Sequence, residues 1–327
     1  LCQRRTPSGT ICYRCYSFCY YYDFKLPGQS DCQETVQKIA GKKVKKHFRL
    51  KPRAEQKVIQ ILLYMMTSVA ILVLIFILAV ILKNGLPQLS LEFLTTNPAH
   101  MGREGGIFST IVTTIYLTFI ALLVATPLGV GTAIYLTEYT SERVVTRIIR
   151  FGAECLAGIP SIIFGLFGFI LFVNKLKFGW SILSGGLTLA FMVLPTIIRT
   201  SEEAIKSVPA AYRLASYSLG STRWQTVTKV VLPSAAPGIA TGVVLSIGRS
   251  IGETAAVIFT AGSALHLPSS IFSSGRTMSV HFYILAREGI SMPKAYGTAA
   301  VLVIAILMIN IITYYLMGKY ISRTSPE

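Results

Sequence analysis

Three observations predict that this chain is an all-α membrane protein, a bundle of six membrane-spanning helices. Its 327 residues are 52% hydrophobic and only 14% charged, which is too apolar for an ordinary soluble domain. Several apolar runs reach the roughly 20 residues that a helix needs to cross a bilayer. The net charge of +17 comes from Lys and Arg residues beside these runs, so orientation in a membrane explains it better than a nucleic-acid-binding face.

Residues 1–57 precede the first apolar run and are expected to form a cytoplasmic tail. Its cysteines are Cys2, Cys12, Cys15, Cys19 and Cys32. The C-x2-C-x3-C spacing fits no common zinc finger and no histidine lies nearby, so we expect no metal site. Residues 1–37 show no packed apolar pattern and no cleavable signal peptide, and are expected to be disordered or to precede the true start. The basic run that follows, residues 38–57, is interpreted as the flank of a spanning helix in preference to a nucleic-acid site.

The transmembrane domain is expected over residues 58–322. Its six spans are predicted at residues 58–82, 107–136, 155–173, 180–198, 235–264 and 298–317. The third is the weakest, because it contains Pro160 and several glycines. Proline and small residues within spans allow kinks and close helix packing. The charged segment before the third span, residues 138–150, is predicted to be an amphipathic connection.

The charges of the connecting segments predict the orientation of the chain. If the amino terminus is inside, the inner segments hold more than twice as many Lys and Arg residues as the outer ones. Those inner segments are residues 38–57, 136–154, 199–234 and 318–327. Because cytoplasmic loops carry an excess of Lys and Arg, both termini and residues 199–234 are predicted to be cytoplasmic.

One polar stretch, residues 214–233 (LASYSLGSTRWQTVTKVVLP), lies between two apolar runs. Gly220 separates two short amphipathic segments, which predicts two helices joined at a glycine turn, because glycine makes such a turn without a Cβ penalty. At helical spacing Trp224, Val227 and Val231 fall on one face, and the stretch ends abruptly at a Leu-Pro pair. From the residues alone, the simplest interpretation is a surface loop that caps the bundle.

The spacing within this stretch is Ala215-Ser216, three residues, Gly220, nine residues, then Val230-x-Leu232-Pro233. It resembles the "EAA" loop of ABC importer permeases, and the resemblance implies a cytoplasmic coupling helix that docks into a groove of an ATPase subunit. Leu214 stands where that family usually has Glu, which removes a charge and leaves the hydrogen bonding of the turn open. The predicted coupling residues are Leu214, Ala215, Ser216, Gly220, Arg223, Trp224, Leu232 and Pro233.

No catalytic apparatus is predicted. The chain has no G-x4-G-K-[ST] loop, because Val36 stands where the first glycine would precede Gly41-Lys42. The chain is therefore expected to be a transport subunit with no bound cofactor, which relies on a partner to hydrolyse ATP, and not an enzyme. The histidines have no metal-ligand spacing and are interpreted as loop residues; they are His47, His100, His266 and His281.

The fifth predicted span contains the block GRSIGET, residues 248–254. Its Arg249 and Glu253 are four residues apart, so they are predicted to share a helix face. An arginine near a helix centre costs about 2.5–3.5 kcal/mol on insertion scales, so it should face a partner or a water-filled path. Two interpretations remain: an ion pair that locks helices together, or a translocation site where Arg249 binds an anion and Glu253 balances it. A guanidinium suits phosphate, because its fork of donors matches a tetrahedral oxyanion.

Four segments indicate the class of substrate. They are VLPTIIRTSEEA from Val193, GSTRWQTV from Gly220, GRSIGETAA from Gly248 and SVHFYILAREGIS from Ser279. They are similar to phosphate-specific ABC permeases of the PstA type, from about residue 58 to the carboxyl end. The resemblance implies a type I importer permease in the bacterial inner membrane, with Arg249 and Glu253 on the substrate path. It also implies a PstC-like permease, two PstB-like ATPases and an extracytoplasmic PstS-like phosphate-binding protein as partners. The alternatives are a permease for another oxyanion such as sulfate or molybdate and, less favoured, a non-ABC carrier or a membrane-embedded enzyme.

Overall fold

The computed structural model describes residues 52–140 and 144–324. The chain forms two units, Leu1–Ile71 and Leu72–Glu327. Helix α3 (Pro52–Gly85) begins in the first unit and ends in the second. The described residues of the first unit all belong to this apolar helix, which contains the first predicted span. Most of the predicted tail, with its cysteine cluster, lies outside the described residues.

The second unit begins with a small cap after α3. The cap contains the single turn η1 (Leu86–Gln88), α4 (Leu91–Thr95), β1 (Pro98–Ala99), the turn η2 (His100–Gly102) and β2 (Glu104–Gly105). Ser90 starts α4, because its side-chain oxygen accepts a hydrogen bond from the amide of Phe93 at 3.0 Å. Strands β1 and β2 pair antiparallel and form a minimal hairpin.

The centre of the second unit is the packing of α5 (Phe108–Ile134) against α8 (Ile182–Ser207). Two glycines allow the close approach, because a Cβ on Gly129 or Gly186 would lie 2.6 Å from an isoleucine side chain of the other helix. The buried residues around this contact include Leu117, Ala121, Ala125, Leu189, Met192, Val193 and Ile197. Helix α5 then continues into the π-helical turn η3 (Tyr135–Tyr139).

The third predicted span, residues 155–173, is wrong as a single helix. The chain instead forms α6 (Val144–Ala157), α7 (Ser161–Gly168) and the π-helical η4 (Phe169–Lys175), with a bend of 103° between the two halves. Pro160 has a ψ of 140°, outside the helical region. Because proline also lacks an amide hydrogen, the helix stops before it and restarts at Ser161.

Helix α8 also runs beyond its predicted end at residue 198 and reaches Ser207. Two salt bridges at helical spacing support the extra turns, Arg199 Nε to Glu203 Oε1 at 3.3 Å and Lys206 Nζ to Glu202 Oε1 at 2.6 Å. The polar character of this segment therefore does not mark the end of the helix.

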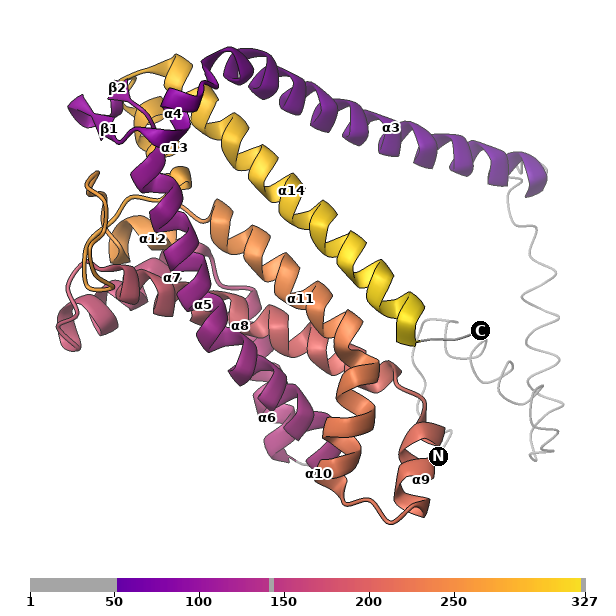
Figure 1. Ribbon diagram of the computed structural model, residues 1–327. Coiled ribbons are helices and arrows are strands. Elements are labelled where there is room, and N and C mark those ends of the chain that lie inside the picture. The colour runs from indigo at the N-terminus through magenta and orange to yellow at the C-terminus, as the bar shows by residue number, and fades with distance from the viewer. Residues whose placement is uncertain (1–51, 141–143, 325–327) are drawn as a thin grey trace, which may run out of the picture. The chain divides into compact units, whose positions relative to one another are not determined.

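The carboxyl-terminal part of the chain contains α9 (Ala210–Ser218), α10 (Arg223–Thr226), the π-helical turn η5 (Val227–Val231), α11 (Leu232–Gly252), α12 (Ala255–Thr260), α13 (Met278–Arg287) and α14 (Met292–Thr324). The fifth predicted span is interrupted, because α11 ends at Gly252 and α12 starts at Ala255. Figure 1 shows the α9–α10 hairpin at one end of α11, with α13 and the β1–β2 hairpin toward the other end of the unit.

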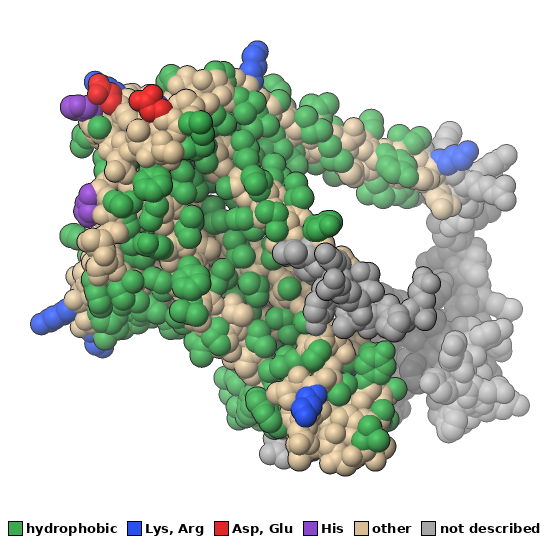
Figure 2. All heavy atoms as spheres, viewed as in Figure 1, with side chains coloured by type: hydrophobic (Ala, Val, Ile, Leu, Met, Phe, Trp, Pro, Cys, Tyr) green, Lys and Arg blue, Asp and Glu red, His purple; other side chains and the backbone are tan. Residues whose placement is uncertain are grey.

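Within the described residues, five helices are long and apolar enough to cross a membrane, and the bent α6–α7 pair makes a sixth if it is counted as one span. The predicted all-α, six-span bundle is confirmed in this sense. Figure 2 agrees with it, because hydrophobic side chains cover most of the described surface in that view, with acidic side chains only near the β1–β2 hairpin. Such an apolar flank is what a helical bundle presents to lipid.

Candidate functional site

The predicted pair of helices joined at Gly220 is present as α9 and α10 (Figure 1). Gly220 has a φ of +78°, in the left-handed region that residues with a Cβ rarely adopt. Its amide donates a hydrogen bond to the carbonyl of Tyr217 at 2.9 Å. The sequence therefore placed the turn correctly, at the residue that its geometry requires.

The turn is fully hydrogen-bonded although Leu214 stands where the family usually has Glu. The Leu214 side chain is 65% exposed and takes no part in this bonding. The hydroxyls of Ser216 and Thr226 bond each other across the hairpin at 2.9 Å in a buried position. Thr222 and Gln225 form a capping box that starts α10. Backbone and hydroxyl groups thus close the turn without the carboxylate that the family usually has.

The predicted face of Trp224, Val227 and Val231 is wrong. Val227 and Val231 are buried, whereas the Trp224 side chain is 61% exposed. Helix α10 has only four residues before the π-helical turn η5 begins at Val227. Because a π-helix has a different spacing from an α-helix, Trp224 does not continue the row of the two valines.

The predicted end of the stretch at Leu232 and Pro233 is also wrong. The chain stays helical from Arg223 to Gly252, so the second helix of the hairpin continues into α11. Pro233 lies in the first turn of α11, directly after η5, where a missing amide hydrogen is tolerated. Motion of the hairpin can therefore reach a spanning helix without a flexible joint.

The remaining coupling residues divide by exposure. Ala215 and Arg223 are exposed beside Leu214 and Trp224, whereas Ser216 is buried and Leu232 is half-buried. Another exposed residue that the sequence analysis did not select is Leu219, at 86% the most exposed apolar side chain of the hairpin. The tip of the hairpin thus carries apolar side chains outward, although its neighbours are polar.

Sequence analysis also missed Arg213, which anchors the hairpin to two other elements. Its guanidinium contacts Glu138 on η3, with Nη2 2.7 Å and Nε 3.0 Å from Oε1. Nη1 and Nη2 also donate to the carbonyls of Val208 and Ile205, at 2.7 and 2.9 Å. The two partners of this ion pair are far apart in the sequence, so no local spacing could have predicted it.

Arg249 and Glu253 are placed differently from the prediction. Arg249 is exposed on the last turn of α11. Glu253 lies just past the helix end in an extended conformation, with φ −73° and ψ 129°, so the two do not share a helix face. Among the residues that the structure describes, no ion pair joins their side chains. The prediction of a shared face failed because it assumed an unbroken helix through Gly252.

Glu253 instead organises the break between α11 and α12. Its side-chain Oε1 accepts a hydrogen bond from the amide of Ala256 at 3.2 Å, at the start of α12. Its carbonyl accepts a hydrogen bond from the Ser279 hydroxyl of α13 at 2.6 Å. In turn, the amide of Met278 donates to the Thr114 hydroxyl of α5 at 3.0 Å. The break in the fifth span is therefore tied to two neighbouring helices.

A second charged cluster lies between α6 and α8. Glu202 is 8% exposed and receives Arg150 Nη2 at 2.8 Å and Lys206 Nζ at 2.6 Å. These residues border an open cavity of about 230 Å³, lined by Arg150, Ala153, Glu154, Ala157, Pro195, Ile198, Arg199, Glu202, Glu203 and Lys206. The lining has three cations and three carboxylates, so the cavity has no excess of one sign to select an anion.

His281 was interpreted as a loop residue, and this is wrong. It lies in α13, is 1% exposed, and its Nδ1 is 3.5 Å from Nη1 of the buried Arg276. Burial, and then the positive charges of Arg276 and Lys294, lower the pKa of His281 to about 4. The ring is therefore neutral at physiological pH and serves as a packed core group.

Among the residues that the structure describes, no group of three or more His, Cys, Asp or Glu could hold a metal ion.

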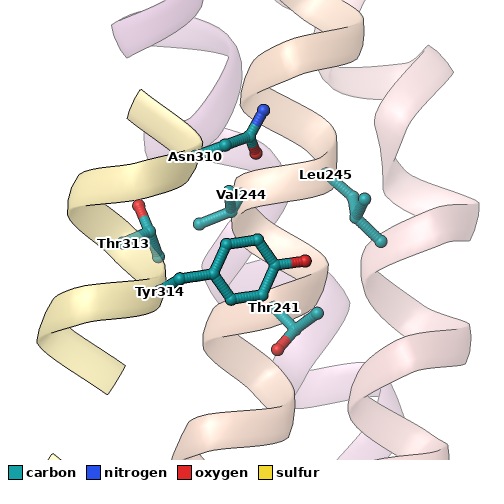
Figure 3. Close-up of a pocket in the computed structure, with 6 residues that line it drawn as sticks. All are labelled: Thr241, Val244, Leu245, Asn310, Thr313 and Tyr314. Carbon is teal, nitrogen blue, oxygen red and sulfur yellow. The ribbon is translucent and has the colours of Figure 1, made fainter. Parts of the chain in front are cut away.

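Figure 3 shows a much smaller cavity between α11 and α14, with a volume of about 10 Å³. It is lined by Thr241, Val244, Leu245, Asn310, Thr313 and Tyr314. The hydroxyls of Thr241 and Thr313 bond carbonyls of their own helices, at 3.0 and 2.8 Å. With so little room, the space is a packing gap between the two helices.

Residues 125–325 match the family model of the binding-protein-dependent transport system inner membrane component. The match covers more than half of the chain and includes the hairpin, the charged cavity and the break after α11. The chain belongs to this family, so it is a membrane permease subunit of an ABC importer, and ATP hydrolysis is not its own activity.

The relatives narrow the class further. A probable ABC transporter permease protein, YqgI of Bacillus subtilis, is 37% identical over 260 residues, which cover 75% of this chain and 88% of the relative. Phosphate transport system permease protein PstA 1 of Mycobacterium tuberculosis (strain ATCC 25618 / H37Rv) is 34% identical over 210 residues, covering 63% of this chain and 68% of the relative. The predicted similarity to permeases of the PstA type is confirmed.

Solved structures agree on the fold. One is a bacterial ABC transporter involved in the import of the acidic polysaccharide alginate, with a TM-score of 0.59, 18% identity, and coverage of 82% of this chain and 99% of that one. Another is the methionine ABC transporter MetNI in inward-facing conformations, with a TM-score of 0.52, 19% identity, and coverage of 66% and 94%. The type I permease fold is therefore confirmed.

Proposed function

We propose that this permease carries phosphate across the bacterial inner membrane, driven by ATP hydrolysis in a partner subunit. The observation that carries the proposal is the 34% identity with a PstA permease over 210 residues. The family match over residues 125–325 includes Arg249. The proposed partners are a PstC-like permease, two PstB-like ATPases and an extracytoplasmic PstS-like phosphate-binding protein. A PstC protein of Pasteurella multocida is itself 36% identical to this chain over 199 residues, which supports a pseudo-symmetric pair of permeases.

The α9–α10 hairpin is proposed as the docking element for the ATPase. Exposed apolar side chains at the tip of a polar segment are suited to a protein partner, because they lose water-exposed area on binding. Leu214, Leu219 and Trp224 provide such a surface, and Arg223 supplies a charge beside it. The charge asymmetry of the connecting segments supports a cytoplasmic position for this hairpin and for both termini.

Arg249 is proposed as the residue that contacts phosphate in transit. It is exposed at the end of an apolar helix, and a charge within a membrane is stable only against a partner or a water-filled path. Its planar fork of donors matches the oxygens of phosphate. Glu253, half-buried at the adjacent break, is proposed to shape that position through its contacts with α12 and α13.

The test is uptake of radiolabelled inorganic phosphate by vesicles that contain the whole importer. Uptake should require ATP inside the cytoplasmic compartment and the phosphate-binding protein outside. An excess of unlabelled phosphate should abolish the signal, whereas sulfate and molybdate should leave it unchanged. Uptake of labelled sulfate or molybdate, with no saturable uptake of phosphate, would assign the permease to another oxyanion and would contradict the proposal.

A further inference from the structure

The side chain of Arg213 connects three elements around one guanidinium. Its Nη2 and Nε contact Oε1 of Glu138 on η3, the turn that ends α5, at 2.7 and 3.0 Å. The same guanidinium donates to the carbonyls of Ile205, in the last turn of α8, and Val208, which follows α8. Arg213 itself belongs to α9, so the hairpin, α5 and α8 meet at a single side chain.

Burial makes this contact strong. The side chains of Arg213 and Glu138 are 20% and 8% exposed, whereas those of the pair Arg199–Glu203 are 76% and 68% exposed. Exposed pairs contribute little, because water and salt screen them. A charged pair that is shielded from water and bonded at several donors holds its geometry more firmly. The carbonyl end of the α8 helix dipole also favours a cation there.

A hydrophobic cluster also joins α5 and α8 to η5 and α11, the elements that follow the hairpin. This buried cluster contains Ala133 of α5, Ala204 and Ile205 of α8, Val208, Val231 of η5 and Ala235 of α11. Between α8 and α9 only two residues, Val208 and Pro209, link the helices along the chain. This short link keeps the start of α9 next to the end of α8, and Arg213 adds a side-chain contact from α9 to both α8 and η3.

We propose that Arg213 is the positioning residue that makes the α9–α10 hairpin move as one body with α5 and α8. The inference rests on the proposed coupling role of the hairpin. It adds the route by which motion of the hairpin is transmitted to the spanning helices. Along one side, η5 continues directly into α11. Along the other side, Arg213 and Glu138 carry the displacement to α5 and α8, which form the central helix contact of the bundle. Coupling therefore uses both ends of the hairpin.

The test uses the whole importer in vesicles and measures ATP hydrolysis and radiolabelled phosphate uptake together. Arg213→Gln should keep the assembled complex and its ATP hydrolysis but lower uptake per ATP by about tenfold, which corresponds to about 1.4 kcal/mol. Glu138→Gln keeps both carbonyl contacts and should give a smaller loss. The double variant should be no worse than Arg213→Gln alone, because both changes remove the same contact. Arg287→Ala is the control, since Arg287 is an exposed arginine that bonds Tyr283 at 2.9 Å.

Two results would overturn the inference. One is an Arg213→Gln complex with the unmodified ratio of uptake to ATP hydrolysed. The other is loss of assembly in Arg213→Gln together with normal coupling in Glu138→Gln, which would make Arg213 only a structural residue. Failure of the proposed function would look different, because the unmodified protein itself would then show no ATP-driven phosphate uptake.

Discussion

Arg249 and Glu253 illustrate how one backbone break changes the chemistry available to two residues. On a continuous helix they would form a pair four residues apart. Because α11 ends at Gly252, the Glu253 side chain instead bonds the start of α12, and Arg249 stays exposed on the preceding turn. An exposed arginine next to an anchored carboxylate is a better candidate for transient anion contact than a closed ion pair.

Substitution of these two residues tests their roles separately. Arg249→Gln should reduce phosphate uptake at least about tenfold with little effect on assembly, because the residue makes no contact that holds the described helices together. Glu253→Gln should cause a smaller loss, since the amide oxygen can still accept the bond from Ala256. The double variant should not recover, because the described side chains form no mutual ion pair. The measurement is phosphate uptake normalised to the amount of assembled complex. The control is Arg147→Gln, at an exposed position of α6. Normal uptake by the double variant would exclude the phosphate contact.

His281 predicts a pH dependence of stability. Its pKa in the folded protein is about 4, below the usual value of about 6.5. The unfolded chain therefore binds a proton between these values and the folded chain does not, so stability is fully present above about pH 6.5 and is lost as the pH falls toward 4. The loss should amount to a few kcal/mol, at about 1.4 kcal/mol for each pKa unit.

The measurement is the thermal unfolding temperature of the purified protein between pH 7.5 and pH 4.5. His281→Gln removes the titrating ring, so its unfolding temperature should be lower at neutral pH but should fall less on acidification. An equally steep fall in both proteins would show that other groups cause the acid sensitivity.

At the scale of the element, the α9–α10 hairpin depends on one left-handed residue. Gly220 has a φ of +78° and no atom within 4 Å of where a Cβ would lie, so only its backbone conformation forbids a larger residue. Left-handed backbone costs residues with a Cβ roughly 1–2 kcal/mol, and a β-branched residue is a strong outlier there. The orientation of α9 against α10 is therefore set by this position.

Gly220→Val should displace the hairpin and uncouple ATP hydrolysis from uptake in the assembled importer. Gly131→Val on α5 is a matched control, because that glycine also has open space around it but an ordinary helical backbone. Uptake per ATP hydrolysed should drop in the first variant and remain unchanged in the second. Equal coupling in both would show that the shape of this turn is unimportant.

The elements that the sequence predicted well are those governed by local pattern. The long apolar runs became α3, α5, α8, α11 and α14, and Gly220 became the turn between α9 and α10. The breaks were harder, because Pro195 lies inside a continuous α8 whereas Pro160 ends a helix, and only tertiary packing separates the two cases. The contact of Arg213 with Glu138 could not be read from the sequence at all, since it depends on how η3 and α9 meet in space.

For the whole molecule, the family and the fold define a permease subunit of an ABC importer. The α9–α10 hairpin is the docking element that we propose for its ATPase. Two features connect the hairpin to the spanning helices: the continuous helical segment from Arg223 to Gly252 and the contact of Arg213 with Glu138. The second leads to the central helix pair α5–α8. The proposed coupling role of the hairpin therefore requires that the ATPase binds there.

Co-purification of the ATPase subunit with the permease pair tests this claim most directly. The unmodified permease should retain the ATPase, and the combined change Leu214→Asp and Trp224→Asp should lose it, because charges replace the exposed apolar surface of the hairpin. The combined change Leu267→Asp and Phe272→Asp, at exposed apolar positions outside the hairpin, is the matched control and should retain the ATPase. Full retention of the ATPase by the hairpin variant, or loss of the ATPase only in the control, would show that the hairpin is not where the ATPase binds.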